Sequence, residues 1–257
     1  MAQGAGPLAV ALLLLAGCAT QPPGQGVSIP VSVSKPDGAG PFPAVVILHD
    51  CSGLGPRSSG APSRWARTLV EHGYVVVIPD SFSTRGAPDG VCLSGSRANN
   101  VGPSRRVQDA FDALGYAQRL PYVDAKRIGV MGGSHGGSTT LLTMAQPGFR
   151  AGVALYPRCS LASSSYKPAA PLLILIGELD DWTPAADCKR LAREVTLKVY
   201  PGAHHSFDSD RPVRFVAARI NPSSASGRGA TTGGNAAAWR DAIEEVTRFF
   251  DRNLSRS

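Results

Sequence analysis

Ser134 lies at the centre of a Gly-x-Ser-x-Gly motif at residues 132–136. A mostly apolar run at residues 127–131 precedes the motif, and small and apolar residues follow it. A serine on a sharp turn between a strand and a helix presents its hydroxyl as a nucleophile, and the turn needs glycines because side chains two positions away would collide. A phosphate-binding loop would need Gly-x-x-x-x-Gly-Lys-Ser/Thr, and no lysine lies near this turn. The motif therefore predicts a nucleophilic serine.

A serine hydroxyl becomes a good nucleophile when a histidine, itself held by a carboxylate, removes its proton. Both partners occur later in the chain, each just after a predicted strand. Asp180 and Asp181 follow one such strand, and His204 and His205 follow another. The order serine, acid, histidine is therefore present, with two adjacent candidates for each of the last two roles.

These three segments together resemble the dienelactone hydrolase family of α/β-hydrolases, over about residues 43–207. In that family the acid lies four residues before the proline of Gly-x-x-Asp-x-x-Thr/Val-Pro, which implies Asp180. The histidine is the second of the pair in Gly-Ala-x-His-x-Phe, which implies His205. Asp181 and His204 are the adjacent alternatives; otherwise Asp181 would be a charge at a helix N-terminus and His204 an exposed loop side chain.

The resemblance also implies an activity. The family's namesake has cysteine where this chain has Ser134, so we expect hydrolysis of ordinary carboxylic esters or lactones through an acyl-enzyme rather than of the namesake's dienelactone. One alternative is a peptidase-like amide hydrolase. The lack of a propeller-sized extra domain argues against this alternative. Another is a non-catalytic, lipid-anchored binding protein. We expect no cofactor and no metal, because no Cys-x-x-Cys or His-x-x-x-His spacing occurs.

The oxyanion of a tetrahedral intermediate needs hydrogen-bond donors. One should be the backbone N–H of His135, the residue after the nucleophile. By family resemblance, the other is the N–H of Cys51, in the loop at residues 49–55. We expect the side chain of His135 to be a packing or surface group rather than a second base.

Two further side chains are candidates for substrate binding. Arg85 follows the strand that ends at Pro79, and its guanidinium could receive a substrate carboxylate; otherwise it forms a structural ion pair or is solvated. Trp182, beside the acid, either lines the acyl pocket or packs on its own loop.

These residues need a scaffold, which the apolar patterns supply. Residues 27–34 alternate apolar and small polar residues, as an antiparallel edge strand does. Six short apolar or β-branched runs read as parallel strands buried on both faces, at residues 44–48, 75–79, 127–131, 151–155, 171–176 and 196–200. Helical patterns occupy residues 63–72, 103–120, 184–195, with Thr183 as N-cap, and 236–254.

Alternating strands and helices predict an α/β class, with the α/β-hydrolase fold: a doubly wound, mostly parallel sheet with helices on both faces. We expect residues 27–257 to form a single catalytic domain, with its site at the carboxyl ends of the strands. The segment from Asn221 to Gly234 reads as a flexible surface loop, with a lid as the alternative.

The N-terminus reads as an export signal. The first 34 residues carry no charged side chain, and the apolar run at residues 8–16 is too short to span the about 30 Å hydrocarbon core of a membrane. Residues 15–18, Leu-Ala-Gly-Cys, resemble the bacterial lipobox. We therefore expect a signal peptide at residues 1–18, lipidation of Cys18 and a flexible tether at residues 19–26. The protein would be exported to the cell envelope and lipid-anchored facing the periplasm, or else secreted or soluble in the periplasm.

Four cysteines remain after Cys18, an even number in a chain expected to enter an oxidising compartment. Four cysteines allow three pairings. We favour Cys51 with Cys92 and Cys159 with Cys188, because each pair would join neighbouring loops; four buried thiols are the alternative. A bridge at Cys51 would either stiffen the oxyanion loop or only staple a surface turn.

The basic residues do not indicate a nucleic-acid partner. Lys and Arg exceed Asp and Glu by 26 to 19, for a net charge of +7, but they are dispersed along the chain rather than gathered with aromatic residues. The expected partner is a small ester or lactone, with a membrane contacted through the lipid anchor. The pattern does not indicate an oligomeric state.

Overall fold

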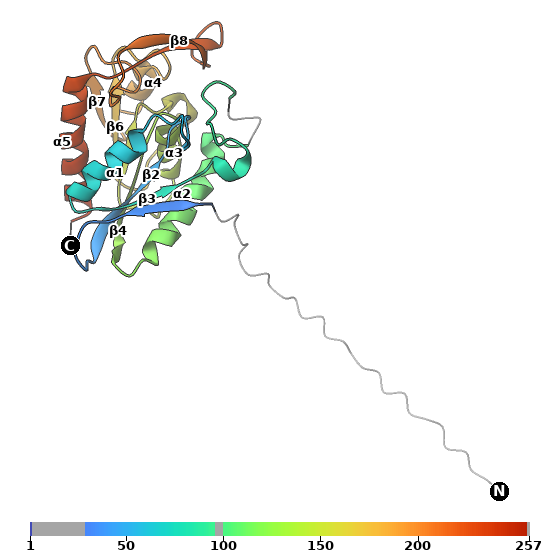
Figure 1. The fold of residues 1–257 in the computed structure, drawn as a ribbon, viewed down its shortest axis with the longest axis vertical. Helices are drawn as coiled ribbons and strands as arrows, with labels where there is room; N and C mark the ends of the chain where they lie inside the picture. Colours follow the sequence, from blue (N-terminus) through green and yellow to red (C-terminus); the bar gives the residue numbers. More distant parts are fainter. Residues whose placement is uncertain (2–28, 96–99, 256–257) are drawn as a thin grey trace.

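The computed structural model of the protein describes residue 1, residues 29–95 and residues 100–255. Its main feature is a seven-stranded sheet in the order β1-β3-β2-β4-β5-β6-β7 (Figure 1). Only β1 runs antiparallel to its neighbour; the other pairs are parallel. The strands are β1 (Val31–Ser34), β2 (Phe42–Leu48), β3 (Val75–Pro79), β4 (Val123–Gly133), β5 (Gly152–Leu155), β6 (Leu172–Gly177) and β7 (Thr196–Tyr200).

Helices cover both faces of this sheet (Figure 1). Helices α1 (Ala61–Glu71) and α5 (Ala236–Asn253) pack together through the edge-to-face pair Trp65–Trp239, whose ring centroids are 4.7 Å apart. Helices α2 (Pro103–Gln118) and α3 (His135–Thr143) contact each other and the central strands. The expected fold, a mostly parallel doubly wound sheet of the α/β-hydrolase type, is confirmed.

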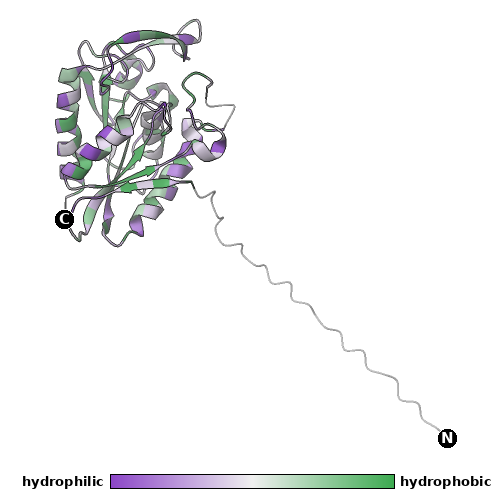
Figure 2. Ribbon diagram, viewed as in Figure 1, coloured by the Kyte–Doolittle hydropathy of each residue, from purple (hydrophilic) through white to green (hydrophobic). Residues whose placement is uncertain are grey.

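The apolar runs are buried as their sequences predict. Every residue from Val75 to Pro79 of β3 and from Leu172 to Gly177 of β6 is buried. Figure 2 shows hydrophobic strands at the centre and helices that are hydrophilic on their outer sides. Such continuous burial is typical of strands that lie between two layers of helices. The core therefore holds the carboxyl ends of the strands in fixed relative positions.

One expected helix is much shorter than its pattern predicts. Helix α4 covers only Ala185–Lys189 instead of residues 184–195, and turns follow it. Thr183 is not its N-cap: Pro184 occupies the cap position without a side-chain cap hydrogen bond. Pro184 has extended backbone (ψ 134°), so the helix begins at Ala185 and the cap position moves past Thr183, whose hydroxyl instead donates to the Asp180 carboxylate, 2.9 Å away. The cap prediction was therefore wrong.

The segment from Asn221 to Gly234 was also predicted incompletely. It contains β9 (Arg228–Thr232), which pairs antiparallel with β8 (Arg214–Ile220), a strand that we did not expect. The hairpin lies at the top of Figure 1. Most of β8 is exposed, and its apolar residues 215–218 form only a short run between Arg214 and Arg219, which does not by itself indicate a strand. Its end contacts the loop after β3, since Ile220 N donates to Cys92 O at 3.2 Å.

Both favoured disulfides are present, Cys51–Cys92 and Cys159–Cys188. The first joins the loop after β2 to the loop after β3. The second joins the loop after β5 to α4, and Cys188 is fully buried. The expected pairing is confirmed.

The double substitution Cys159→Ser/Cys188→Ser should lower the free energy of unfolding by about 3 kcal/mol, because the bond closes a loop between residues 29 positions apart. Urea unfolding followed by circular dichroism measures this effect. Wild type in a thiol reductant is the matched comparison and should unfold at a lower urea concentration than oxidised wild type. Equal midpoints for oxidised wild type and the variant would contradict the prediction.

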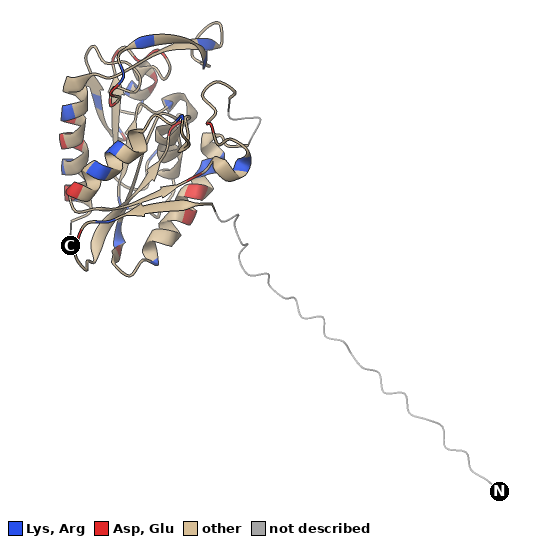
Figure 3. Ribbon diagram, viewed as in Figure 1, with Lys and Arg blue, Asp and Glu red and all other residues tan. Residues whose placement is uncertain are grey.

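The expected signal peptide, Cys18 and tether lie outside the described residues. Among the residues that the structure describes, no helix is long and apolar enough to cross a membrane. Figure 3 shows Lys and Arg spread over α1, α2, α5 and β8, with Asp and Glu between them on the helices.

Candidate active site

Ser134 lies on a strained turn between β4 and α3. Its φ is 54° and its ψ is −113°, a conformation that a non-glycine residue rarely adopts. A Cβ at Gly136 would lie 1.9 Å from Leu48 O, and one at Gly132 would lie 2.5 Å from the backbone of Gly136. The two glycines therefore allow the close approach of β2, β4 and α3 that the turn requires.

His205 connects this serine to a carboxylate. Its Nε2 lies 2.8 Å from Ser134 Oγ, and its Nδ1 lies 2.8 Å from Asp180 Oδ2. A carboxylate can only accept here, so Nδ1 carries the proton and Nε2 can accept from the serine hydroxyl. His205 is fully buried and Asp180 is 4% exposed. The three side chains come from the loops after β4, β6 and β7, as expected for this sheet.

Backbone and side-chain donors fix the Asp180 carboxylate. Oδ1 accepts from Trp182 N at 2.9 Å and from Thr183 N at 2.8 Å, and Oδ2 accepts from the Thr183 hydroxyl. These bonds orient the carboxylate toward the imidazole of His205.

The two adjacent alternatives are engaged elsewhere. The exposed Asp181 accepts from the amide and the hydroxyl of Thr231 in β9, both at 2.8 Å. His204 is a partly exposed loop side chain whose Nδ1 lies 3.0 Å from Leu179 O. The structure thus brings together Ser134, Asp180 and His205.

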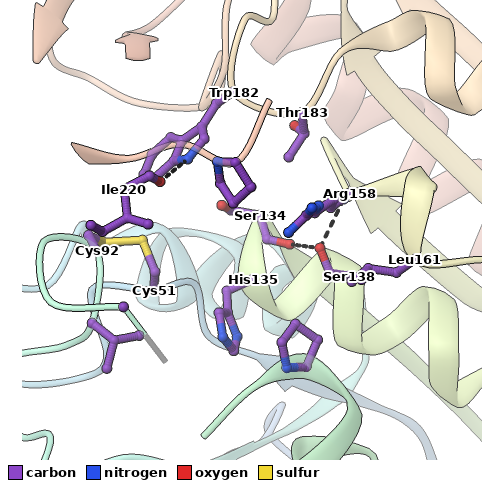
Figure 4. A pocket seen from close by; sticks show the side chains of 14 residues that line it. Cys51, Cys92, Ser134, His135, Ser138, Arg158, Leu161, Trp182, Thr183 and Ile220 are labelled. Atoms are coloured by element: carbon purple, nitrogen blue, oxygen red, sulfur yellow. Dashed lines mark hydrogen bonds between the residues drawn. A yellow bond between two sulfur atoms is a disulfide. The ribbon is translucent and has the colours of Figure 1, made fainter. Parts of the chain in front are cut away.

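A cavity of about 170 Å³ lies over the serine (Figure 4). Trp182 forms part of its wall, with its ring 4.8 Å from that of His205 and its Nε1 donating to Ile220 O at 2.8 Å. Trp182 thus lines the cavity, one of its two expected positions. Apart from Ser134, His135 and Trp182, the lining residues are Cys51, Val91, Cys92, Gly95, Pro103, Ser138, Arg158, Leu161, Thr183, Ile220 and Pro222.

Both expected oxyanion donors border this cavity. Cys51 and His135 are lining residues, and His135 is the first residue of α3. In the described part of the chain, neither backbone amide donates to another protein atom. Both amides are therefore available to a ligand oxygen.

The His135 ring is a packing group, as expected. Its Nε2 is buried, and its Nδ1 lies 2.8 Å from Nη1 of Arg106. Burial, and secondarily the positive charge of Arg106, hold the pKa of His135 well below its usual value. The ring is therefore neutral at physiological pH.

Arg85 does not reach the cavity. Its guanidinium makes two hydrogen bonds of 2.6 Å to the buried carboxylate of Asp109, and Nη1 also donates to Ser81 O. The bonds to Asp109 raise the pKa of Arg85. The guanidinium is thus used by an internal ion pair, and the expected substrate-carboxylate role is replaced by the structural alternative.

Sequence reasoning missed two contributors to the site. Arg158, the one charged side chain among the described residues that line the cavity, follows β5 at a carboxyl end, so the same topological rule could have found it. Tyr156 lies under His205, with ring centroids 4.7 Å apart, and donates to the buried carboxylate of Asp208 at 2.8 Å. Burial raises the pKa of Asp208. No local pattern indicates the Tyr156–Asp208 contact, because 52 residues separate the two.

Within residues 29–95 and 100–255, no group of His, Cys, Asp and Glu side chains could hold a metal ion.

Known proteins resemble both the sequence and the fold. The sequence model of the Dienelactone hydrolase family matches residues 29–254. A protein of Methylorubrum extorquens provisionally named carboxymethylenebutenolidase is 27% identical over 219 residues, which cover 77% of this chain and 74% of that one.

Solved structures share the fold. A Klebsiella pneumoniae protein provisionally named dienelactone hydrolase has a TM-score of 0.66 at 21% identity, covering 89% of this chain and 95% of that one. A thermophilic esterase from Thermogutta terrifontis has a TM-score of 0.59 at 14% identity, covering 88% and 91%. The family match extends over nearly all the described residues, so this chain belongs to the dienelactone hydrolase family and is a hydrolase of the α/β-hydrolase fold.

Proposed function

We propose that this hydrolase cleaves carboxylic esters or lactones through an acyl-enzyme on Ser134. The observation that carries the proposal is the continuous chain of two 2.8 Å contacts from Asp180 through His205 to Ser134 Oγ. A serine, a neutral imidazole and a carboxylate in this order are the elements of nucleophilic acyl transfer. The family's relatives support esters or lactones as the substrate class.

The reaction follows from this geometry in two halves. Ser134 Oγ attacks the carbonyl carbon while His205 Nε2 takes its proton, and the carbonyl oxygen becomes an oxyanion that accepts from the amides of Cys51 and His135. Collapse expels the alcohol, which receives the proton from His205, and leaves an ester on Ser134. Water then loses a proton to His205 and attacks this ester, and collapse releases the acid while His205 returns the proton to Ser134 Oγ. Asp180 holds the imidazole in the required tautomer and stabilises its charged form.

The cavity predicts a preference for small acyl groups. Its volume of about 170 Å³ is below the about 300–1,000 Å³ typical of sites for drug-sized ligands. We expect kcat/KM for p-nitrophenyl butyrate to exceed that for p-nitrophenyl palmitate by about tenfold or more, because a long chain cannot be enclosed. Initial-rate measurements on the two esters, below the micelle concentration of the longer one, decide this.

If p-nitrophenyl palmitate is cleaved as fast as p-nitrophenyl butyrate or faster, the predicted preference for small acyl groups is wrong. Cleavage of an acyl-p-nitroanilide but of no ester or lactone would favour the amide hydrolase. Cleavage of none of these substrates would favour the alternative of a non-catalytic, lipid-anchored binding protein.

We also propose that the protein works in the cell envelope, anchored through lipidated Cys18, with a single catalytic domain at residues 27–257. The two disulfides support a location outside the reducing cytoplasm. The lipobox-like sequence supports the anchor. Both remain predictions from the sequence.

A further inference from the structure

Arg106 of α2 is fully buried beside the two segments that carry the proposed oxyanion donors. Its Nη1 donates to His49 O at 2.9 Å and lies 2.8 Å from Nδ1 of His135. His49 is two residues before Cys51, and His135 carries the other donor amide. One guanidinium thus bridges the loop after β2 and the start of α3.

The positive charge at this place belongs to Arg106 and not to the imidazoles around it. A guanidinium has no acceptor, so His135 Nδ1 must accept the bond. His49 Nε2 accepts from Ser81 N at 3.2 Å, and its Nδ1 donates to Asp50 O at 2.9 Å. Burial and Arg106 lower the pKa of His49 as well as that of His135. Both rings are therefore neutral.

Among residues 29–95 and 100–255, no carboxylate hydrogen-bonds to Arg106. Burial lowers the pKa of Arg106 to about 10, which still leaves it charged at neutral pH. Within the described residues, its Nε and Nη2 have no hydrogen-bond partner. Asp109, one turn along α2, is bonded to Arg85 instead. Among the described residues, the ring centroid of Phe82 also lies 5.0 Å from the guanidinium carbon, and the carboxylates of Asp109, Asp50 and Asp80 favour its charge from a distance without a hydrogen bond.

Burying a cation without a hydrogen-bonded carboxylate costs free energy, and a purely structural role does not require it. Removing a charge from water is unfavourable unless it is paired, and replacement of buried ionic groups by apolar ones is often neutral or stabilising. The guanidinium would gain most when a negative charge forms nearby. In the proposed reaction that happens at the oxyanion, beside the amides of Cys51 and His135.

We propose that Arg106 is a positioning residue for the oxyanion hole: its guanidinium holds the Cys51 loop against His135, and its charge favours the oxyanion. This inference rests on the proposed function. The bond to His49 O fixes the loop that presents the Cys51 amide, and the bond to the His135 ring fixes the residue that presents the second amide. Because the oxyanion forms only in the transition state, the effect falls on kcat rather than on KM.

The test compares Arg106→Met, Arg106→Lys and Arg105→Met. Arg105 is the matched control: it is the neighbouring residue of α2, its side chain is 38% exposed, and it lies 3.9 Å from Asp109. We expect Arg106→Met to lower kcat for p-nitrophenyl butyrate about 10²-fold with KM little changed, a loss comparable to removal of one oxyanion donor. Arg106→Lys keeps the charge but not the planar fork, so its kcat should lie between Arg106→Met and wild type. Arg105→Met should match wild type.

Butylboronic acid supplies a readout that a merely structural role would not move. Its boron forms a bond to Ser134 Oγ while the hydroxyl proton passes to His205 Nε2, and the resulting tetrahedral anion places one boron-bound oxygen in the oxyanion position. Its inhibition constant should rise in Arg106→Met by about the factor by which kcat falls, while KM for the ester stays constant. In a variant that is only destabilised, the ratio of the boronate inhibition constant to the KM for the ester would be the same as in wild type.

A wild-type kcat in Arg106→Lys together with an unchanged boronate constant would overturn the inference, and so would equal kinetics of Arg106→Met and Arg105→Met. If Arg106→Met does not fold, the lysine variant alone decides, since it retains the charge. Retained hydrolysis in Ser134→Ala would refute the proposed function itself. Loss of hydrolysis in Ser134→Ala with no effect at Arg106 would refute only the positioning role.

Discussion

Replacement of Ser134 by alanine should lower kcat for p-nitrophenyl butyrate by about 10⁴-fold or more. The substitution removes the atom that attacks the carbonyl carbon, while the oxyanion amides and the cavity remain. Ser134 is only 8% exposed, and its amide donates to Leu155 O at 2.9 Å, a bond that alanine retains. We therefore expect the variant to fold and to bind the ester. Stopped-flow and steady-state release of p-nitrophenol measure the loss.

A second observable ties the loss to covalent chemistry. A fluorophosphonate should add one phosphonyl group to wild type, with release of fluoride, and none to Ser134→Ala, as seen by intact-protein mass spectrometry. The exposed Ser104 of α2 provides a control, and Ser104→Ala should be labelled and active like wild type. Labelling of Ser134→Ala, or wild-type turnover in it, would remove Ser134 from the mechanism.

Asp180→Asn should also be severe, with kcat reduced by about 10⁴-fold. An asparagine amide can donate to His205 Nδ1, which would place the imidazole proton on Nε2 and leave no base for the serine. The substitution also removes the negative charge of Asp180, which stabilises the imidazolium form of His205. KM should change little, because Asp180 does not line the cavity.

Asp181→Asn is the matched comparison, with the same chemical change one residue away. Asp181 bonds Thr231 of β9, so this variant should loosen the hairpin without changing the imidazole and should retain most of the activity. Urea unfolding of both variants separates stability from catalysis. A larger loss of kcat in Asp181→Asn than in Asp180→Asn would reassign the acid.

Local patterns were sufficient for the strands of the seven-stranded sheet and for the nucleophile turn. Continuous apolar runs mark strands that are buried on both faces, and the glycines around Ser134 mark a turn in which a Cβ would collide. The choice between Asp180 and Asp181 could not come from these patterns. It depends on which carboxylate the folded loop turns toward His205, and only the resemblance to a family indicated it in advance.

Long-range partners explain what the sequence did not reveal. Arg85 reads as a candidate substrate ligand until α2 brings Asp109 beside it. Arg106 lies at helical spacing from Ala110, Ala113 and Ala117, yet its charge gives no reason in the sequence to expect it to be buried with them. Helix α4 begins after Pro184, whose backbone is extended, and the Thr183 hydroxyl is bonded to Asp180 rather than capping the helix. The apolar residues 215–218 of β8 are mostly exposed and lie between two arginines, so their pattern differs from that of the core strands.

The position of Trp182 gives the protein an intrinsic optical probe. The chain has three tryptophans. Trp65 and Trp239 pack against each other between α1 and α5, and neither lines the cavity. Trp182 alone forms part of the cavity wall, with its indole N–H bonded to Ile220 O. Displacement of water from the cavity by an acyl group therefore changes the emission of one indole, and binding can be followed by fluorescence without a label.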